Sequence, residues 1–414
     1  MRKYFVVFLL VAFGIFFAYY SEFRSEQPEK KFVNLLESPN WIFEAKDEGK
    51  PDNISEIFIN GGALYSISGQ AAWSGERIHK INLTNGKELD LLDYYSADNL
   101  NNDSLIARRR YDQTLLVDLH TKEETLLEAV NTPSRFYAVK HGSIVKVTGG
   151  NKLSMLLLDK GKWKDAWEAT IGDEGTTIYG VLFANGKIII DSVVVKLDDF
   201  YKDKYDKCKK ENKGVFSIIA CDDIGYINKT RQLSTHNLDS GLIEFKIVVD
   251  DGETDRVFVN SMQMIDGDSV IVNYGRFLRI YNIRSYQEEW STKTSPTDRQ
   301  GYIEKYVLNN ENLIYSEYQA LKSRELYGKA LNWALDTGSQ IVDFSVLDKD
   351  IVYVSTEGKK EDGEEKSIAP AVLAISTSEG KELKRFSFGV PARKLLVNNK
   401  ILYSVNANTI YSIK

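Results

Sequence analysis

The chain has 414 residues, of which 43% are hydrophobic and 27% charged, and its formal net charge is −6. This composition excludes a disordered chain and a membrane protein with many spans, and it allows a large buried core. The mild acidity disfavours nucleic-acid binding, because such proteins need a basic face against phosphates. We therefore expect no nucleic-acid partner.

The first apolar segment covers residues 4–20 and follows Arg2 and Lys3. As a helix it would be about 25 Å long, marginal for a hydrocarbon core of about 30 Å. The basic start predicts that everything after Tyr20 is exported. No good cleavage site follows, so we expect a single-pass anchor, with a cleaved signal and a periplasmic or secreted protein as the alternative. Residues 1–24 form this anchor or signal, and residues 25–39 form a linker.

The rest of the chain has the composition of a β protein. It is rich in Tyr and Phe, with 23 and 19 residues against 4 Met, and its β-branched residues gather in short runs. Such residues fit a pleated surface better than a helix. No long segment shows a convincing helical apolar stripe, so we predict an all-β fold for residues 40–414.

A strand–turn–strand pattern recurs along this region. Most copies lie near the period of about 40–50 residues that is typical of a four-stranded propeller blade. Shorter hairpins with Asn-Gly or Asp-Gly turns lie between the copies, which makes four strands per period. The recurring turns are at Gly86, Lys122, Gly161, Gly241, Tyr286, Gly338 and Gly380.

The two ends of the region are single strands, at residues 40–46 and 408–414. An open ring would expose sheet edges, and pairing the first strand with the last blade would remove them. Seven hairpins and one closing pair predict an eight-bladed β-propeller of four-stranded antiparallel blades. Seven blades is the alternative.

The long interval between Gly161 and Gly241 predicts one blade with an insertion at residues 198–229. The insertion contains the two cysteines of the chain, Cys208 and Cys221, on a predicted hairpin. In an exported protein such a pair is expected to form a disulfide. Aromatic residues held on a rigid frame often carry binding energy. The candidate partner contacts are Phe200, Tyr201, Tyr205 and Phe216.

Two copies resemble a known repeat, namely Val372–Ile375 with the following Glu379–Leu383, and Asn332–Gly338. They are similar to the repeat of the PQQ-like, or quinoprotein-dehydrogenase-like, β-propeller superfamily. That repeat has an Ala-Leu-Asp segment, a Thr-Gly-Lys turn and a tryptophan four residues after the glycine. Trp290 has this spacing and Phe245 replaces the tryptophan once. Three copies depart from the pattern, with Asp90, Val342 and Lys384.

The resemblance implies a propeller, nearest in type to the non-catalytic BamB-like members. Its quinoprotein enzymes carry adjacent cysteines and a metal held by Glu, Asn and Asp, whereas Cys208 and Cys221 are not adjacent and no C-x-x-C-H haem motif occurs. We therefore expect no cofactor, no metal and no catalytic residue. The four histidines are expected to be isolated strand or turn residues: His79, His120, His141 and His236.

These patterns favour a non-catalytic scaffold in the cell envelope. It would be a monomeric ring, attached to the membrane through residues 4–20, that binds a protein or polysaccharide. The alternative is a degenerate quinoprotein-like or sugar-acting enzyme that uses the central channel, because a fold does not decide a function.

Overall fold

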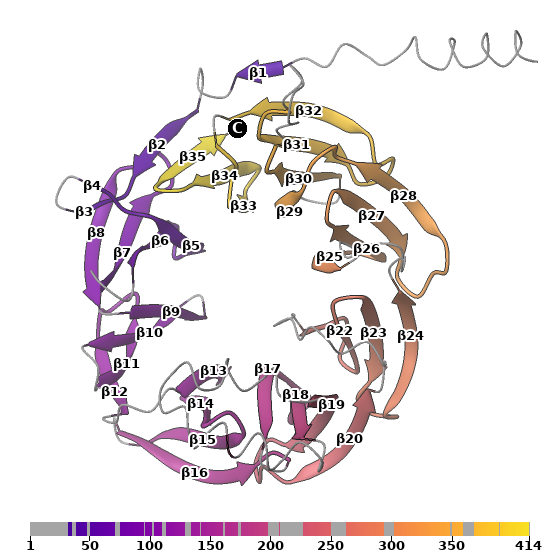
Figure 1. Cartoon of the computed structure of the whole chain (residues 1–414). Coiled ribbons are helices and arrows are strands. Elements are labelled where there is room, and N and C mark those ends of the chain that lie inside the picture. The colour runs from indigo at the N-terminus through magenta and orange to yellow at the C-terminus, as the bar shows by residue number, and fades with distance from the viewer. Residues whose placement is uncertain are drawn as a thin grey trace, which may run out of the picture.

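The computed structural model describes residues 32–34, 39–47, 50–70, 75–94, 96–101, 103–109, 113–128, 134–140, 142–159, 162–172, 175–197, 207, 227–249, 262–293, 302–347, 350–358, 368–388 and 390–413. Eight sheets, each built on four antiparallel strands, form a ring (Figure 1). This confirms the predicted eight-bladed propeller. The predicted N-terminal helix lies outside these ranges, and within them no helix is long and apolar enough to cross a membrane.

The blades follow one another in chain order. Blade one contains β5 (Ile54–Asn60), β6 (Ala63–Gln70), β7 (Gly75–Asn82) and β8 (Glu88–Tyr94). Blade two contains β9 (Ser96–Asn101), β10 (Ser104–Arg109), β11 (Gln113–Asp118) and β12 (Glu124–Glu128). Blade three contains β13 (Ser134–Lys140), β14 (Ser143–Thr148), β15 (Lys152–Asp159) and β16 (Lys162–Thr170). Blade four contains β17 (Thr176–Ala184), β18 (Lys187–Leu197), β19 (Ile227–Asn237) and β20 (Ile243–Val249).

The second half of the ring has the same order. Blade five contains β21 (Met262–Met264), β22 (Ser269–Asn273), β23 (Phe277–Asn282) and β24 (Gln287–Lys293). Blade six contains β25 (Ile303–Asn309), β26 (Asn312–Glu317), β27 (Ala320–Glu325) and β28 (Leu331–Asp336). Blade seven contains β29 (Ile341–Leu347), β30 (Ile351–Thr356), β31 (Ala371–Ser376) and β32 (Glu382–Ser387), with β1 (Phe32–Asn34) added in parallel to β32.

Blade eight joins the two ends of the chain. It contains β33 (Lys394–Asn398), β34 (Ile401–Asn406), β35 (Thr409–Ile413) and, as its outermost strand, β2 (Trp41–Glu44). Strands β2 and β35 are antiparallel, with Trp41 opposite Ser412 and Glu44 opposite Thr409. The predicted closing pair is thereby confirmed. A short hairpin of β3 (Lys46–Asp47) and β4 (Lys50–Pro51) leads from β2 into blade one.

One predicted hairpin is wrong. The turn at Gly338 does not join two strands of a blade, because it connects β28, the last strand of blade six, to β29 of blade seven. The corresponding turn of blade six lies at Tyr327 and Gly328, between β27 and β28. A turn such as Asp336-Thr337-Gly338 has the same local pattern within a blade and between blades, so the sequence pattern does not distinguish the two positions.

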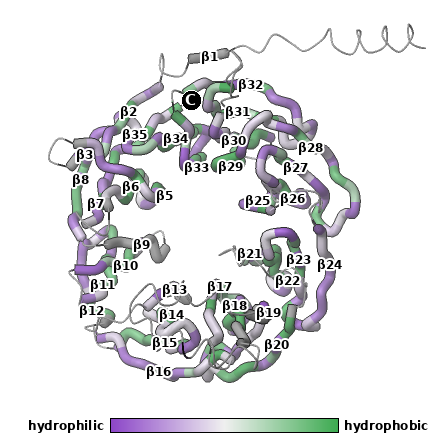
Figure 2. The backbone as a smooth tube through the Cα atoms, in the orientation of Figure 1, coloured by the Kyte–Doolittle hydropathy of each residue, from purple (hydrophilic) through white to green (hydrophobic). Residues whose placement is uncertain are grey.

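Hydrophobic packing between neighbouring blades holds the ring together. The middle strands are apolar and the outermost strands more polar (Figure 2). At the junction of blades six and seven, for example, Ile314 and Leu321 pack with Val354 and Leu373, and all four are buried. We call each such junction a seam, and the turn between the third and fourth strands of a blade its outer turn.

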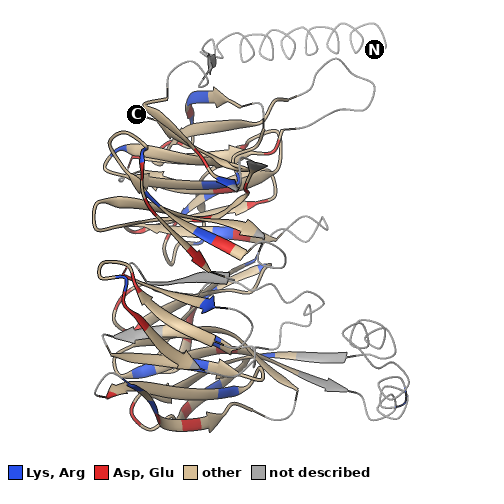
Figure 3. Ribbon diagram, turned by 90° about the vertical axis from the view of Figure 1, so that its left-hand side faces the viewer, with Lys and Arg blue, Asp and Glu red and all other residues tan. Residues whose placement is uncertain are grey.

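The alternating strand directions give the ring two different faces. The turn face carries the outer turns and the turns between first and second strands. The opposite insertion face carries the connection between β18 and β19, where the predicted insertion lies. These strands have 11 residues each and pair as far as Leu197 and Ile227. The edge-on view of Figure 3 shows the two faces of the ring at its left and right sides.

Candidate functional site

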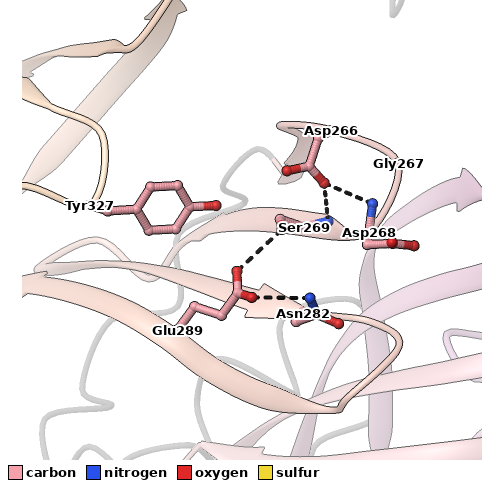
Figure 4. A pocket seen from close by; sticks show the side chains of 7 residues that line it. All are labelled: Asp266, Gly267, Asp268, Ser269, Asn282, Glu289 and Tyr327. Atoms are coloured by element: carbon pink, nitrogen blue, oxygen red, sulfur yellow. Dashed lines mark hydrogen bonds between the residues drawn. The ribbon is translucent and has the colours of Figure 1, made fainter.

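A polar pocket opens on the turn face at the seam between blades five and six (Figure 4). Its volume is about 770 Å³. Blade five provides most of the wall, from the turn before β22 and from β23 and β24, and blade six provides Tyr327 from its outer turn. The lining residues are Asp266, Gly267, Asp268, Ser269, Asn282, Glu289 and Tyr327.

Internal hydrogen bonds hold the polar side chains of this pocket in place. The Glu289 carboxylate accepts hydrogen bonds from Asn282 Nδ2 at 3.0 Å and from Ser269 Oγ at 3.2 Å. The Asp266 carboxylate accepts the backbone N–H groups of Asp268 and Ser269 at 2.8 and 2.7 Å. Such a fixed wall loses little entropy when a ligand binds.

The remaining groups set the chemistry of the pocket. Arg284 forms an ion pair with Asp268 at 3.0 Å. Among the residues that the structure describes, no ion pair involves the carboxylate of Asp266 or Glu289. Burial raises the pKa of Tyr327, Glu289 and Asp266 add to the rise, and a hydrogen bond with Ser269 opposes it. The phenol therefore stays protonated at neutral pH. Acceptors beside one aromatic ring suit a ligand that carries hydroxyl or amine groups.

His79 takes part in a buried network that resembles a catalytic triad in its order of groups. Its Nε2 lies 2.8 Å from Ser68 Oγ, and its Nδ1 lies 2.6 Å from Glu88 Oε1. Ser68 also donates a hydrogen bond to Asp52 at 2.9 Å, and its side chain is fully buried. A nucleophile must reach its substrate, and the buried hydroxyl of Ser68 is not placed to do so. We therefore interpret the network as structural: it links β6, β7 and β8 to Asp52, in the segment that follows the closing strand β2.

Two further histidines, His120 and His236, lie in blades two and four. His236 is buried, and its Nε2 and Nδ1 contact Ser234 Oγ at 3.0 Å and the Gly241 carbonyl at 3.1 Å. Burial lowers its pKa, which favours the neutral ring. His120 is an exposed turn residue beside Asp103, and His141 lies outside the described residues. Within the described ranges no group of three or more His, Cys, Asp or Glu residues is placed to hold a metal.

The predicted contacts of the insertion lie outside the described residues. This applies to both cysteines, Cys208 and Cys221, and to the four aromatic candidates, Phe200, Tyr201, Tyr205 and Phe216. The disulfide and the partner contacts therefore stay predictions. The structure describes the base of the insertion, where β18 ends at Leu197 and β19 begins at Ile227.

Tryptophans on four outermost strands reach across a seam to the outer turn of the next blade. Each indole N–H donates a hydrogen bond to a backbone carbonyl there. The pairs are Trp41 with Leu83 (2.9 Å), Trp167 with Leu238 (3.1 Å), Trp290 with Gly328 (3.2 Å) and Trp333 with Thr377 (2.7 Å). In three seams the indole also covers a turn glycine, because a Cβ atom at Gly86, Gly241 or Gly380 would lie 2.6 Å from the ring.

Two further seams use different residues at the same place. Between blades one and two, Asp90 pairs with Lys122 at 2.5 Å. Between blades four and five, Phe245 stacks on Tyr286, with ring centroids 4.1 Å apart. Lys122 and Tyr286 both have positive φ, of 62° and 60°, at the turn position that glycine occupies elsewhere. Asp90, which departs from the repeat in sequence, therefore still bridges its seam.

The comparisons with known proteins concern the fold. The computationally designed protein Ika8 is similar, with a TM-score of 0.59 and 10% identity, over 91% of this chain and 99% of that chain. Dihydro-heme d1 dehydrogenase NirN is similar, with a TM-score of 0.54 and 12% identity, over 82% of this chain and 67% of that chain. BamB from Moraxella catarrhalis matches over 90% of this chain and 85% of that chain at 9% identity, but its TM-score of 0.41 is too low to support an argument.

No family model matches the chain, and no curated protein does. The TM-scores of 0.59 and 0.54 show a shared fold, whereas identities of 10% and 12% say nothing of a shared activity. The expected resemblance to quinoprotein-like propellers is thus supported as a propeller fold.

Proposed function

We propose that this protein is a binding scaffold of the cell envelope, a closed ring that presents an insertion to a protein or polysaccharide partner. The observation that carries the proposal is the long pair of β18 and β19, which extends from one face of a ring whose own blades are packed together. Functional differences between proteins of one fold concentrate in segments that leave the frame. The pocket between blades five and six is a second, polar contact point.

The proposed location rests on the apolar residues 4–20, which we take as an uncleaved anchor. Membership of the PQQ-like superfamily is also part of the proposal. It is supported by contacts between a turn glycine and a tryptophan across the seams, for example between Gly380 and Trp333.

A crosslinking experiment on membranes tests the scaffold function. In one variant a short Gly-Ser turn replaces residues 203–223, and in a second variant Tyr327→Ala removes the aromatic wall of the pocket. We expect the loop variant to keep the melting temperature of the ring and to lose the crosslinked partner, because the partner contacts lie on the insertion. Full capture by the loop variant would place the contact elsewhere, and loss only in Tyr327→Ala would place it at the pocket.

A further inference from the structure

The exposed large hydrophobic residues are distributed unevenly between the two faces. Within the described ranges, most lie at or next to the turn-face ends of the outer two strands: Ile42, Leu89, Leu157, Leu158, Leu242, Ile243, Tyr327, Leu331 and Leu383. Leu91 and Leu126 lie in the middle of β8 and β12. At the insertion-face ends there are four: Val248, Val342, Ile368 and Val390.

The apolar side chains of the turn face follow the circumference of the ring. Among the described residues, every blade except blades two and five exposes an aliphatic side chain there, and Leu242 in blade four and Leu383 in blade seven are 70% and 58% exposed. A single globular partner would need one contiguous patch, whereas an extended flat partner meets all sides at once. The residues are mainly Leu and Ile, which enter the acyl boundary of a bilayer most readily.

The N-terminal strand leaves the ring on the same face. Strand β32 begins at the turn face, directly after the outer turn of blade seven. Because β1 is parallel to β32, with Phe32 opposite Arg385 and Asn34 opposite Ser387, β1 also begins at the turn face. An antiparallel β1 would have started at the insertion face. Residues 21–31 separate this point from the apolar segment and span at most about 36–40 Å.

We infer that the ring lies with its turn face on the lipid bilayer, held by residues 4–20 at one side and by the exposed aliphatic side chains of six blades around its circumference. The inference rests on the proposed membrane location. It places the insertion face, and so the proposed partner contacts, away from the membrane. Blade five, which exposes no aliphatic side chain among the described residues, presents its polar pocket to the headgroups instead.

Photocrosslinking to lipid tests this orientation in the full chain reconstituted into vesicles of phosphatidylethanolamine and phosphatidylglycerol. A photoreactive residue replaces Leu158 or, as the matched control, Lys152 at the other end of the same strand, β15. The two positions are about 20 Å apart. We expect several-fold more lipid adducts from position 158 than from position 152. Equal labelling, or more from position 152, would overturn the inference.

A second pair of probes tests whether the whole face touches the bilayer. Leu242, directly before β20 in blade four, and Leu383, in β32 of blade seven, belong to strands on different sides of the ring (Figure 1). We expect lipid adducts from both. Adducts from position 383 alone would show a ring that is tethered by its edge, which contradicts the inference.

Alkaline extraction of the same vesicles separates this inference from the proposed anchor. Protein that resists extraction but shows no difference between positions 158 and 152 keeps the anchor and loses the orientation. Protein that washes off yet forms adducts from position 158 keeps the orientation and loses the anchor. Protein that washes off and forms no adducts contradicts both.

Discussion

The seam between blades six and seven and the seam between blades one and two solve one packing problem with different chemistry. In the first, the Trp333 indole covers Gly380 and donates a hydrogen bond to Thr377. In the second, Asp90 and Lys122 form an ion pair that is partly exposed, at 27% and 53% of their side-chain surface. Both contacts join an outermost strand to the outer turn of the next blade.

The difference shows that the ring does not depend on one residue type at this place. An indole buries a large apolar area, whereas an exposed ion pair contributes little net free energy. The buried side chains of the middle strands, such as Leu105 and Val117 near the polar seam, must therefore hold blades one and two together. Seams with tryptophan should depend far more on their bridging residue than the polar seam does.

Removing the indole should have the largest effect. We expect Trp333→Ala to lower the free energy of unfolding by about 3–5 kcal/mol, because it leaves a cavity and removes the hydrogen bond to the Thr377 carbonyl. Guanidinium denaturation followed by circular dichroism measures the change. Trp333→Phe, which keeps most of the ring volume, should lose less. An equal loss in Asp90→Ala would abolish the contrast between the two seams.

Crowding the turn glycine should have the next largest effect. Gly380→Ala adds a methyl group that would lie 2.6 Å from the Trp333 ring, at a φ of 68°. Gly186→Ala is the matched control, because its φ is 72° and no atom lies within 4 Å of the added Cβ. We expect Gly380→Ala to cost about 1–3 kcal/mol more than the control, the usual cost of overpacking. Equal denaturation midpoints would mean that the indole moves aside freely.

The aromatic seam between blades four and five should show an intermediate effect. Phe245→Leu removes the stacking on Tyr286 but keeps an apolar side chain, and we expect a loss of about 0.5–1.5 kcal/mol. A double-mutant cycle with Tyr286→Leu isolates the contact itself. Additive losses in the cycle would show that the rings do not interact.

The ion pair between blades one and two should have the smallest effect. We expect Asp90→Asn to cost about 0.2–1 kcal/mol at low salt and less at high salt. The hydrogen bond from Lys122 lowers the pKa of Asp90, so its contribution is present above the ordinary Asp range and disappears as the pH falls through the lowered value. The wild-type advantage should therefore vanish in acid, and a constant difference from pH 7 to pH 3 would contradict the pairing.

The sequence predicted the blade number and the closing pair because local turn signals recur at a regular period. The pairing of the first strand with the last followed from the unpaired ends, whereas its register, with Trp41 opposite Ser412, came from the structure. The bridging roles of Trp167 and Trp333 were not predicted, since their distance from the preceding turn differs from that of the repeat. The pocket was also missed, because Glu289 and Tyr327 come from different blades and share no local pattern.

The junction of β2 with β35 also determines when the fold can be completed. About 370 residues separate the two partners, and at 5–20 residues per second the ribosome needs on the order of 20–70 s to make them. Throughout this time the edge of β2 has no partner from β35, and it is an apolar stretch containing Trp41 and Phe43. A chaperone that covers this stretch until the C-terminus emerges would protect the nascent chain from aggregation, whereas the finished ring would no longer need it.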